Sequence, residues 1–93
     1  MKCDFCFVGE PEWDYPCGHV ELPLPDGRTF VSDDGWIACN TCSSLIEGDD
    51  YVGLLARCEE TLGGSGGLYE AHKEFAAQRL GPRVPLEEWE KRA

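Results

Sequence analysis

Positive charge is scarce in this sequence. Its 93 residues include 8 lysine and arginine side chains against 18 aspartate and glutamate side chains, so the net charge is −10 at pH 7. The imbalance is concentrated in residues 1–56, where eleven acidic side chains face only Lys2 and Arg28. Proteins bind nucleic acids mainly by contacting phosphates with lysine and arginine. The composition therefore argues against a nucleic-acid contact through residues 1–56.

Long apolar runs are also missing. No stretch of about eighteen apolar residues occurs, so the sequence predicts no membrane span. The first residues, Met1-Lys2-Cys3, lead directly into a cysteine pair and leave no room for an apolar signal segment. We therefore expect a cytoplasmic protein, in which the reducing compartment keeps thiols available for metal ions rather than disulfides.

Motifs for catalysis are absent as well. The sequence contains no HExxH, no GxSxG and no phosphate-binding loop, because Gly63–Gly67 lacks both the lysine and the preceding strand. His72 lies between Glu70 and Glu74 on a predicted helix, a setting more typical of a packed or surface histidine than of a catalytic one. The sequence therefore predicts a protein that is not an enzyme.

Six cysteines are present, and four of them form two CxxC pairs. Cys3 and Cys6 make the first pair, and Cys39 and Cys42 make the second, with 32 residues between them. This spacing lets each pair present two sulfurs to one ion, and four thiolates bind zinc as a closed tetrahedral site. We predict one structural zinc ion on these four residues. Buried free cysteines and an iron–sulfur cluster on the same thiolates are the alternatives.

The rest of the chain predicts alternating short strands and helices. Val20, Leu22 and Leu24 alternate as in a half-buried strand, and Pro25-Asp26-Gly27 forms a turn toward a partner strand at residues 29–31. Trp36-Ile37-Ala38 leads into Cys39, and a helical pattern follows Cys42.

Two longer helices are expected after that pattern. Asp49 or Asp50 can cap a helix that ends at Gly63. A last long helix spans residues 68–80 and ends before Gly81-Pro82. Pro85 then opens a short helical turn.

This order indicates a fold class and a division of the chain. A knuckle at residues 1–9, followed by a β-hairpin and a helix carrying the second CxxC pair, indicates a small α+β, treble-clef-like zinc finger. A zinc ribbon would instead place the second pair in another hairpin. Residues 1–62 would form the zinc-finger domain and residues 63–67 a glycine-rich joint. Residues 68–93 would form a C-terminal helix and tail that packs on the domain or extends from it.

The remaining cysteines and histidines are weaker candidates for metal ligands. Cys17 and His19 could supply a spare ligand, or half of a second site together with Cys58 and His72. These four lie on separate predicted elements, and Cys58 occupies the apolar stripe of its helix. We therefore expect a partly buried thiol at Cys17, an exposed His19 and a buried Cys58. Acidic surroundings would also raise thiol pKa values, which disfavours a redox switch.

Several segments carry a resemblance to a known group. They are Cys3-Asp4-Phe5-Cys6, Trp13-x-Tyr15-Pro16, Gly35-Trp36-Ile37-Ala38-Cys39-x-x-Cys42, Leu45-Ile46-Glu47 and His72-x-x-Phe75-x-x-x-Arg79-x-Gly81-Pro82. Together they resemble small uncharacterised treble-clef-like zinc-finger proteins of actinobacteria and their phages, over residues 3–86. The likeness implies a cytoplasmic treble-clef-like domain and brings no activity with it. Cys17-Gly18-His19 departs from the pattern of the group.

These observations favour a non-enzymatic, acidic, zinc-stabilised module that binds a protein partner with a basic surface. A phage or mobile-element origin would make it a modulator of a host protein, with Leu86 and Trp89 as candidate anchors. The alternative is a nucleic-acid-associated regulator that uses the bases of residues 57–93, which are Arg57, Lys73, Arg79, Arg83, Lys91 and Arg92. An enzyme with an open metal position or a reactive thiol is the second alternative.

Overall fold

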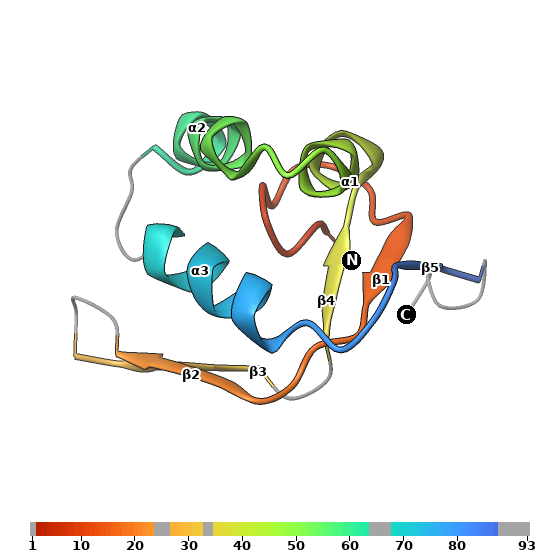
Figure 1. The fold of residues 1–93 in the computed structure, drawn as a ribbon. Helices are drawn as coiled ribbons and strands as arrows, with labels where there is room; N and C mark the ends of the chain where they lie inside the picture. The colour runs from red at the N-terminus through yellow and green to blue at the C-terminus, as the bar shows by residue number, and fades with distance from the viewer. Residues whose placement is uncertain (1, 24–26, 33–34, 64–67, 88–93) are drawn as a thin grey trace.

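The computed structural model describes residues 2–23, 27–32, 35–63 and 68–87. Within these residues the chain forms three helices and two small sheets, a small α+β arrangement. The elements are β1 (Trp13–Tyr15), β2 (Val20–Pro23), β3 (Thr29–Ser32), β4 (Trp36–Ala38), α1 (Asn40–Glu47), α2 (Tyr51–Leu62), α3 (Leu68–Gln78) and β5 (Val84–Pro85). In Figure 1, α3 lies between the two helices α1 and α2 and the β2–β3 hairpin. No helix in the described part of the chain is both long and apolar enough to cross a bilayer.

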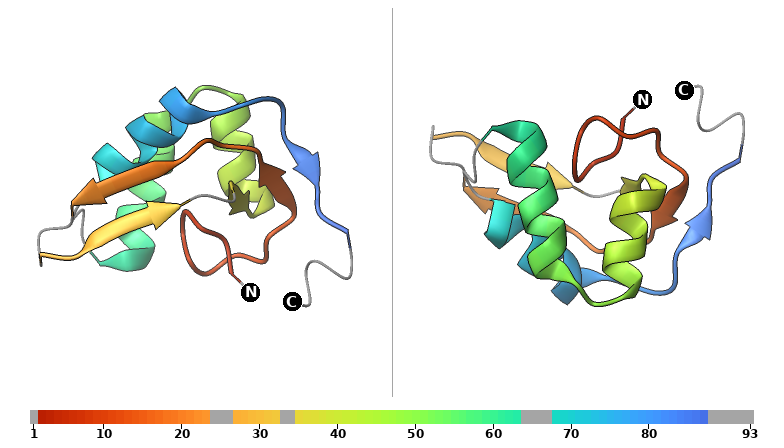
Figure 2. Two further views of the ribbon diagram at one scale, coloured as in Figure 1. Left: turned by 90° about the horizontal axis from the view of Figure 1, so that it is seen from below. Right: turned by 90° about the horizontal axis from the view of Figure 1, so that it is seen from above.

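The predicted hairpin is confirmed. β2 and β3 pair antiparallel, with Val20 opposite Ser32 and Pro23 opposite Thr29. Val20 is buried, and β2 packs against α3, as the two views of Figure 2 show. Pro23 has no N–H to donate, and the last pair of a ladder is a position where a strand tolerates this. Leu24, Pro25 and Asp26 of the predicted strand and turn lie outside the described residues.

A second sheet joins segments that are distant in sequence. β1 lies in its centre, antiparallel to β4 on one side and to β5 on the other. The prediction of a helical turn opened by Pro85 is wrong, because Val84 and Pro85 pair with Asp14 and Trp13 instead. Leu86 N–H also donates to the carbonyl oxygen of Glu12 at 3.0 Å. Pairing with β1 satisfies backbone groups that a short isolated turn would leave to water.

The helix boundaries follow local capping chemistry. α1 begins at Asn40, earlier than the periodicity predicts, and Cys39 is its N-cap. Asp50 caps α2, with its carboxylate accepting from Gly53 N–H at 2.9 Å, and Gly63 ends α2 in the left-handed conformation with φ 74°. Both caps of α2 were expected from sequence. Gly64–Gly67 of the predicted joint lie outside the described residues.

α3 ends at Gln78 rather than at Leu80. The predicted longer helix is wrong because the chain after Gln78 bonds to the segment that joins β1 and β2. Gly18 N–H donates to the Gln78 carbonyl oxygen at 2.8 Å, and Leu80 N–H donates to the Pro16 carbonyl oxygen at 2.9 Å. Tertiary hydrogen bonds thus replace the helical bonds expected for the last two predicted residues.

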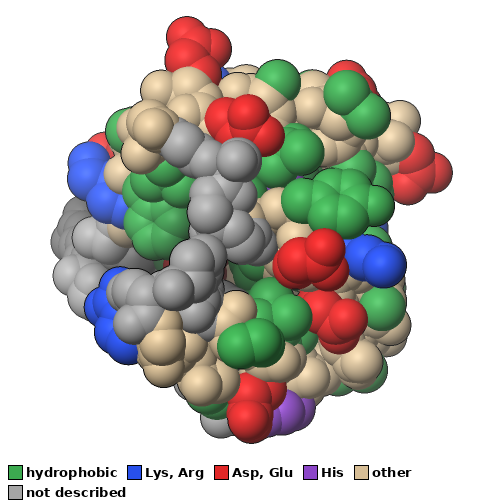
Figure 3. All heavy atoms as spheres, turned by 90° about the vertical axis from the view of Figure 1, so that its left-hand side faces the viewer, with side chains coloured by type: hydrophobic (Ala, Val, Ile, Leu, Met, Phe, Trp, Pro, Cys, Tyr) green, Lys and Arg blue, Asp and Glu red, His purple; other side chains and the backbone are tan. Residues whose placement is uncertain are grey.

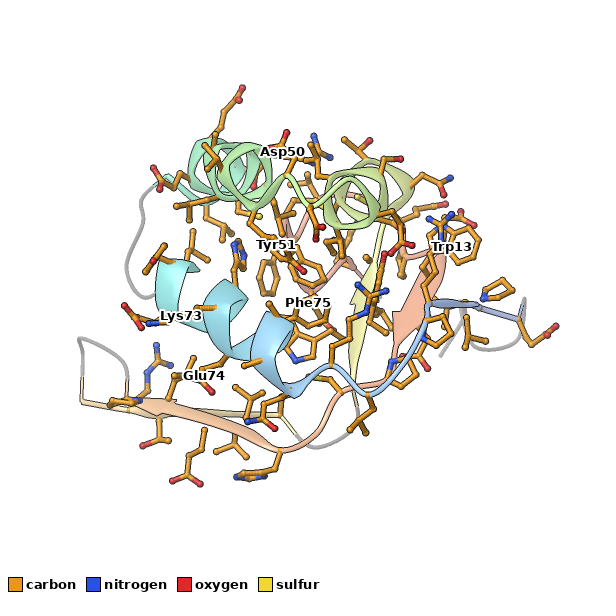
Figure 4. All side chains as sticks on the ribbon, in the orientation of Figure 1. Trp13, Asp50, Tyr51, Lys73, Glu74 and Phe75 are labelled. Carbon is orange, nitrogen blue, oxygen red and sulfur yellow. The ribbon has the colours of Figure 1, made fainter. Side chains whose placement is uncertain are left out.

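An aromatic cluster occupies the centre of the molecule. The Phe75 ring of α3 lies 5.1 Å from the Phe5 ring, 5.5 Å from the Tyr15 ring and 5.3 Å from the Trp36 ring, measured between centroids. Phe5, Tyr15 and Phe75 are fully buried. In Figure 4, Phe75 points from α3 into the space between the helices and the sheet. Edge-to-face contacts of this kind stabilise beyond the apolar area they bury. The cluster therefore joins α3 to the N-terminal knuckle and to both β1 and β4.

Candidate metal centre

The first cysteine pair sits on a tight turn at the start of the chain. Cys3 N–H donates to the Gly9 carbonyl oxygen at 2.9 Å, and Phe7 N–H donates to the Cys3 carbonyl oxygen at 3.0 Å. Phe7 closes the turn in the left-handed region, with φ 61°. This conformation costs a non-glycine residue about 1–2 kcal/mol, so the surrounding bonds must hold it in place. The turn directs Cys3 and Cys6 to the same side.

Gly9 is required by the close approach of the second pair. A Cβ atom at this position would lie 2.6 Å from the Cys39 Cβ and 2.7 Å from the Cys39 Sγ. Any other residue would therefore push the knuckle away from Cys39. Because Gly9 has no side chain, its backbone can also come close enough for its N–H to donate to the Cys6 Sγ at 3.4 Å.

The second pair is held by the start of α1. Cys39 is the N-cap, and its Sγ accepts a hydrogen bond from Cys42 N–H at 3.4 Å. A two-way contact ties this segment to the knuckle. Asp4 N–H donates to the Ile37 carbonyl oxygen at 2.9 Å, and the Asp4 carboxylate accepts from Ile37 N–H at 2.9 Å. These two hydrogen bonds fix the end of β4, and therefore Cys39, beside the first cysteine pair.

All four predicted ligands come together. The Sγ atoms of Cys3, Cys6, Cys39 and Cys42 lie within 4.8 Å of one another, and all four residues are buried. The Cys6 and Cys39 sulfurs are 3.8 Å apart. A tetrahedral ion with metal–sulfur bonds of about 2.3 Å places its sulfurs about 3.8 Å apart. The cluster therefore fits a single metal ion held by four thiolates.

Raised pKa values make three of the four thiols hold the protons that metal binding must displace. The hydrogen bond with the Cys42 thiol, and then burial, raise the pKa of Cys3 to about 12. The hydrogen bond with Cys3 lowers the pKa of Cys42, but contact with the Cys58 thiol and burial outweigh it, so that the pKa is raised overall. Burial also raises the pKa of Cys39. Metal-free thiols of this kind hold their protons at neutral pH, so metal uptake releases protons.

Arg57 is the functional residue that the sequence analysis missed. Its Nη2 lies 3.7 Å from the Cys6 Sγ and 3.9 Å from the Cys39 Sγ. One turn along α2, the Thr61 hydroxyl donates to the Cys6 carbonyl oxygen at 2.8 Å. Four thiolates around a divalent ion carry two net negative charges, which a guanidinium partly neutralises. Arg57 counted only as one base among six in the sequence, and no local pattern points to this role.

A polar network links α1 to Tyr15 of the aromatic cluster. The Tyr15 hydroxyl lies 2.8 Å from the Ser43 Oγ and donates to the Glu47 carboxylate at 2.9 Å. Arg79 donates to the same carboxylate at 3.1 Å, and Arg83 donates to the Ser43 Oγ at 2.7 Å. Ser43 is fully buried, so these partners satisfy a hydroxyl that would otherwise be costly to bury.

The other thiols and histidines do not join the cluster. Cys17 is buried, and its Sγ contacts the Phe75 carbonyl oxygen at 3.8 Å, whereas His19 is exposed beside Glu21. Cys58 is fully buried in α2 next to Cys42 without belonging to the group of four. His72 is buried at 4% exposure and packs against Phe5. His19 is exposed and Cys58 is buried, as predicted, whereas Cys17 is more deeply buried than the partly buried thiol that the sequence predicts.

One candidate binding residue is excluded as an exposed anchor. Leu86 is only 8% exposed, because β5 holds it against the sheet. Trp89, the second candidate anchor, lies outside the described residues.

Comparison with known proteins finds no relative of this chain. No protein-family model matches the chain, and neither a curated protein nor a solved structure is significantly similar to it.

Proposed function

We propose that the four thiolates hold one zinc ion as a closed structural site, in a cytoplasmic, non-enzymatic, acidic module that binds another protein. The observation that carries the metal assignment is the compact group of four buried sulfurs within 4.8 Å. A four-iron cluster bonds each thiolate to a different iron atom and needs its sulfurs farther apart than one ion does. Zinc is the common occupant of a closed four-thiolate site.

The treble-clef hypothesis is supported by the placement of the second pair. Cys39 caps α1 and Cys42 lies in its first turn, whereas a zinc ribbon would place both on a hairpin. The first pair lies on the knuckle that precedes the strands. A domain of this type uses its metal to fix a turn against a helix start, and binding free energy then becomes folding free energy.

Catalysis at the metal is disfavoured by the donor set. Four thiolates complete the tetrahedral shell of zinc, so no position remains for a water molecule or a substrate. Burial raises the pKa of Cys17 as well, which keeps this thiol protonated and unreactive at neutral pH. Neither the metal route nor the thiol route to an enzyme has a supporting observation.

Protein binding is supported by the charge that remains available at the surface. The chain has a net charge of −10, and three of the bases that could contact nucleic acid already have partners. Arg57 contacts the cysteine sulfurs, Arg79 pairs with Glu47, and the Arg83 guanidinium lies 3.7 Å from the centroid of the Trp13 ring. Lys91 and Arg92 lie outside the described residues. We therefore propose a partner with a basic contact face, such as a host protein that a phage-encoded modulator would bind.

Two titrations test this function. The partner is first captured from host lysate with the zinc-loaded protein, and both the partner and a DNA duplex are then titrated at two salt concentrations. We expect no duplex binding at physiological salt, and an association rate with the partner that falls as salt rises. Nanomolar duplex binding would instead favour the nucleic-acid regulator.

Charge reversal on the helices sharpens this test. Glu60 and Glu70 are exposed on α2 and α3, so the double variant Glu60→Lys/Glu70→Lys should slow association several-fold. Glu70 lies in the first turn of α3, where a carboxylate suits the helix dipole, so the thermal midpoint should fall by a few degrees. The matched variant Glu60→Gln/Glu70→Gln should show about half of the effect on association. Asp50 is avoided because it caps α2, and Asp33 and Asp34 lie outside the described residues. A partner indifferent to both variants would contradict the proposal.

A further inference from the structure

A hollow of about 280 Å³ opens between α2 and α3. We call it the α2–α3 groove, and it is lined by Tyr51, Val52, Leu55, Tyr69, His72, Lys73 and Ala76. Val52 is 82% exposed and Tyr69 is 60% exposed, although both are apolar enough to be expected inside. Figure 4 shows Tyr51 reaching from α2 toward α3, with Lys73 on the outer side of α3. Exposed apolar surface that lines a concave site marks a place where a ligand or partner binds.

His72 gives the groove a polar group without a partner. The residue is 4% exposed, and its Nδ1 is buried without a hydrogen bond in the part of the chain that the structure describes. Burial lowers the pKa of His72, so the ring is neutral at pH 7 and carries one donor and one acceptor nitrogen. A buried polar atom left without a partner costs free energy. A guest with a hydrogen-bonding group would recover it after a small turn of the His72 ring brings Nδ1 to the groove.

The surroundings of the groove are acidic. Asp49 and Asp50 directly precede Tyr51 at the start of α2, and Glu70 lies one turn before Lys73 on α3, whereas Figure 4 shows Glu74 on the side of α3 that faces the β2–β3 hairpin. Lys73 is the one charged residue among those that line the groove. Figure 3 shows hydrophobic side chains interspersed with acidic ones on the side of the molecule that lies at the left of Figure 1. A guest with cationic groups beside an apolar body would complement this arrangement.

We propose that the α2–α3 groove binds an aromatic side chain with a hydrogen-bonding group, such as tyrosine, presented by a lysine- or arginine-rich segment of a partner protein. The hollow is of the size of one such side chain, and its lining is apolar apart from His72, Lys73 and the tyrosine hydroxyls. Tyrosine combines an apolar ring with a polar tip and is enriched at binding hot spots. This inference rests on the proposed function as a protein-binding module and names the contact it would use.

Short synthetic peptides test the groove without the natural partner. The zinc-loaded, isotope-labelled protein is titrated with acetyl-Gly-Lys-Tyr-Lys-Gly-amide, followed by amide NMR shifts. We expect a dissociation constant in about the millimolar range, with shifts concentrated at the residues that line the groove. Replacing the central tyrosine by alanine should weaken binding about tenfold, and replacing it by phenylalanine should weaken binding about threefold. Replacing both lysines by glutamate should weaken binding as well.

Variants of the protein test whether the peptides bind in the groove. Val52→Lys places a cation at the groove on a highly exposed residue and should abolish the shifts, whereas Leu80→Lys makes a comparable change at a residue that is 72% exposed and does not line the groove. His72→Phe should remove the preference for tyrosine over phenylalanine. Shifts centred elsewhere, equal binding of the alanine peptide, or equal effects of Val52→Lys and Leu80→Lys would overturn the groove assignment.

The same variants separate this inference from the proposed function. If the captured partner binds in a salt-dependent manner and Val52→Lys does not weaken it, the groove assignment fails and the protein-binding function stands. If the peptides bind in the expected order but no protein with a basic face is captured, the groove assignment stands and the proposed function fails.

Discussion

The guanidinium of Arg57 lies 3.7 Å from the sulfur of Cys6, although the two residues are 51 positions apart in the sequence. The contact brings the middle of α2 against the N-terminal knuckle, and the Thr61 hydroxyl holds the same knuckle through the Cys6 carbonyl oxygen. Once the thiols become thiolates, the guanidinium faces their negative charge in a partly buried setting, where charge pairs are screened little. Arg57 therefore couples the position of α2 to occupancy of the metal centre.

Replacing Arg57 should weaken the hold on the metal. For Arg57→Ala we expect zinc affinity to fall about 10- to 100-fold, because residues that support the ligands contribute on this scale. Competition with a chromophoric zinc chelator at fixed pH measures the change. Lys73→Ala removes the same charge from an exposed residue of α3 and is the matched control, with affinity expected to stay at the parent value. Equal affinities for the two variants would show that Arg57 only packs against the cysteines.

Loss of one ligand should unfold the domain. In Cys39→Ser the four-thiolate shell is broken, although serine can still cap α1, so we expect no retained zinc and a collapse of amide dispersion. Cys17→Ser is the control, because Cys17 is equally buried but lies outside the cluster, and it should retain one zinc per chain. Native mass spectrometry and amide NMR spectra provide the readouts. A sharp thermal transition of Cys39→Ser near the parent midpoint would show that the metal is incidental.

Local chemistry explains what the sequence predicted. The CxxC pairs, the Asp50 cap and the Gly63 helix end all depend on residues a few positions apart, and each lies where its local pattern places it. The β2–β3 hairpin follows from alternation and a glycine-containing turn in the same way. The metal-site residues could therefore be chosen from spacing alone.

Long-range pairing explains what the sequence did not predict. β5 has two residues, and only its pairing with β1, about seventy positions earlier, makes it a strand. α3 stops at Gln78 because Leu80 N–H bonds to the Pro16 carbonyl oxygen instead of to a carbonyl oxygen of the helix. The contact of Arg57 with the cysteines is also long-range, since it depends on how α2 packs against the knuckle. Tertiary contacts of this kind leave no mark on local periodicity.

The hydroxyl of Tyr15 should contribute measurably to stability. It lies in hydrogen-bond contact with Ser43 and Glu47 while the residue is fully buried, so Tyr15→Phe leaves buried polar groups with fewer partners. We expect a loss of about 1–2 kcal/mol in the free energy of unfolding, measured by urea denaturation of the zinc-loaded protein. Tyr69→Phe removes the same atom from a residue that is 60% exposed and should change stability by less than about 0.5 kcal/mol. Similar losses in both variants would contradict a role for the network.

Burial of His72 should make stability depend on pH. Its folded pKa is lowered from 6.5 by burial, so the unfolded chain takes up a proton that the folded chain resists. The stability is fully present above pH 6.5 and should decline as pH falls toward the folded pKa, by at most about 1.4 kcal/mol per pH unit. Tyr51 lines the same groove and stays neutral in this range, because burial raises its pKa.

The measurement is the difference in unfolding free energy between pH 7.5 and pH 5.5, taken for zinc-loaded protein and for two histidine variants. Protonation of thiolates in acid affects all three alike, so it cancels in the comparison. His72→Gln should lose less stability between the two pH values than the parent, because its side chain does not titrate. His19→Gln removes the exposed histidine and should follow the parent. A parent and a His72→Gln variant with the same loss would mean that the His72 ring is protonated as easily in the folded chain as in the unfolded one, and that the ring in the α2–α3 groove is not held neutral.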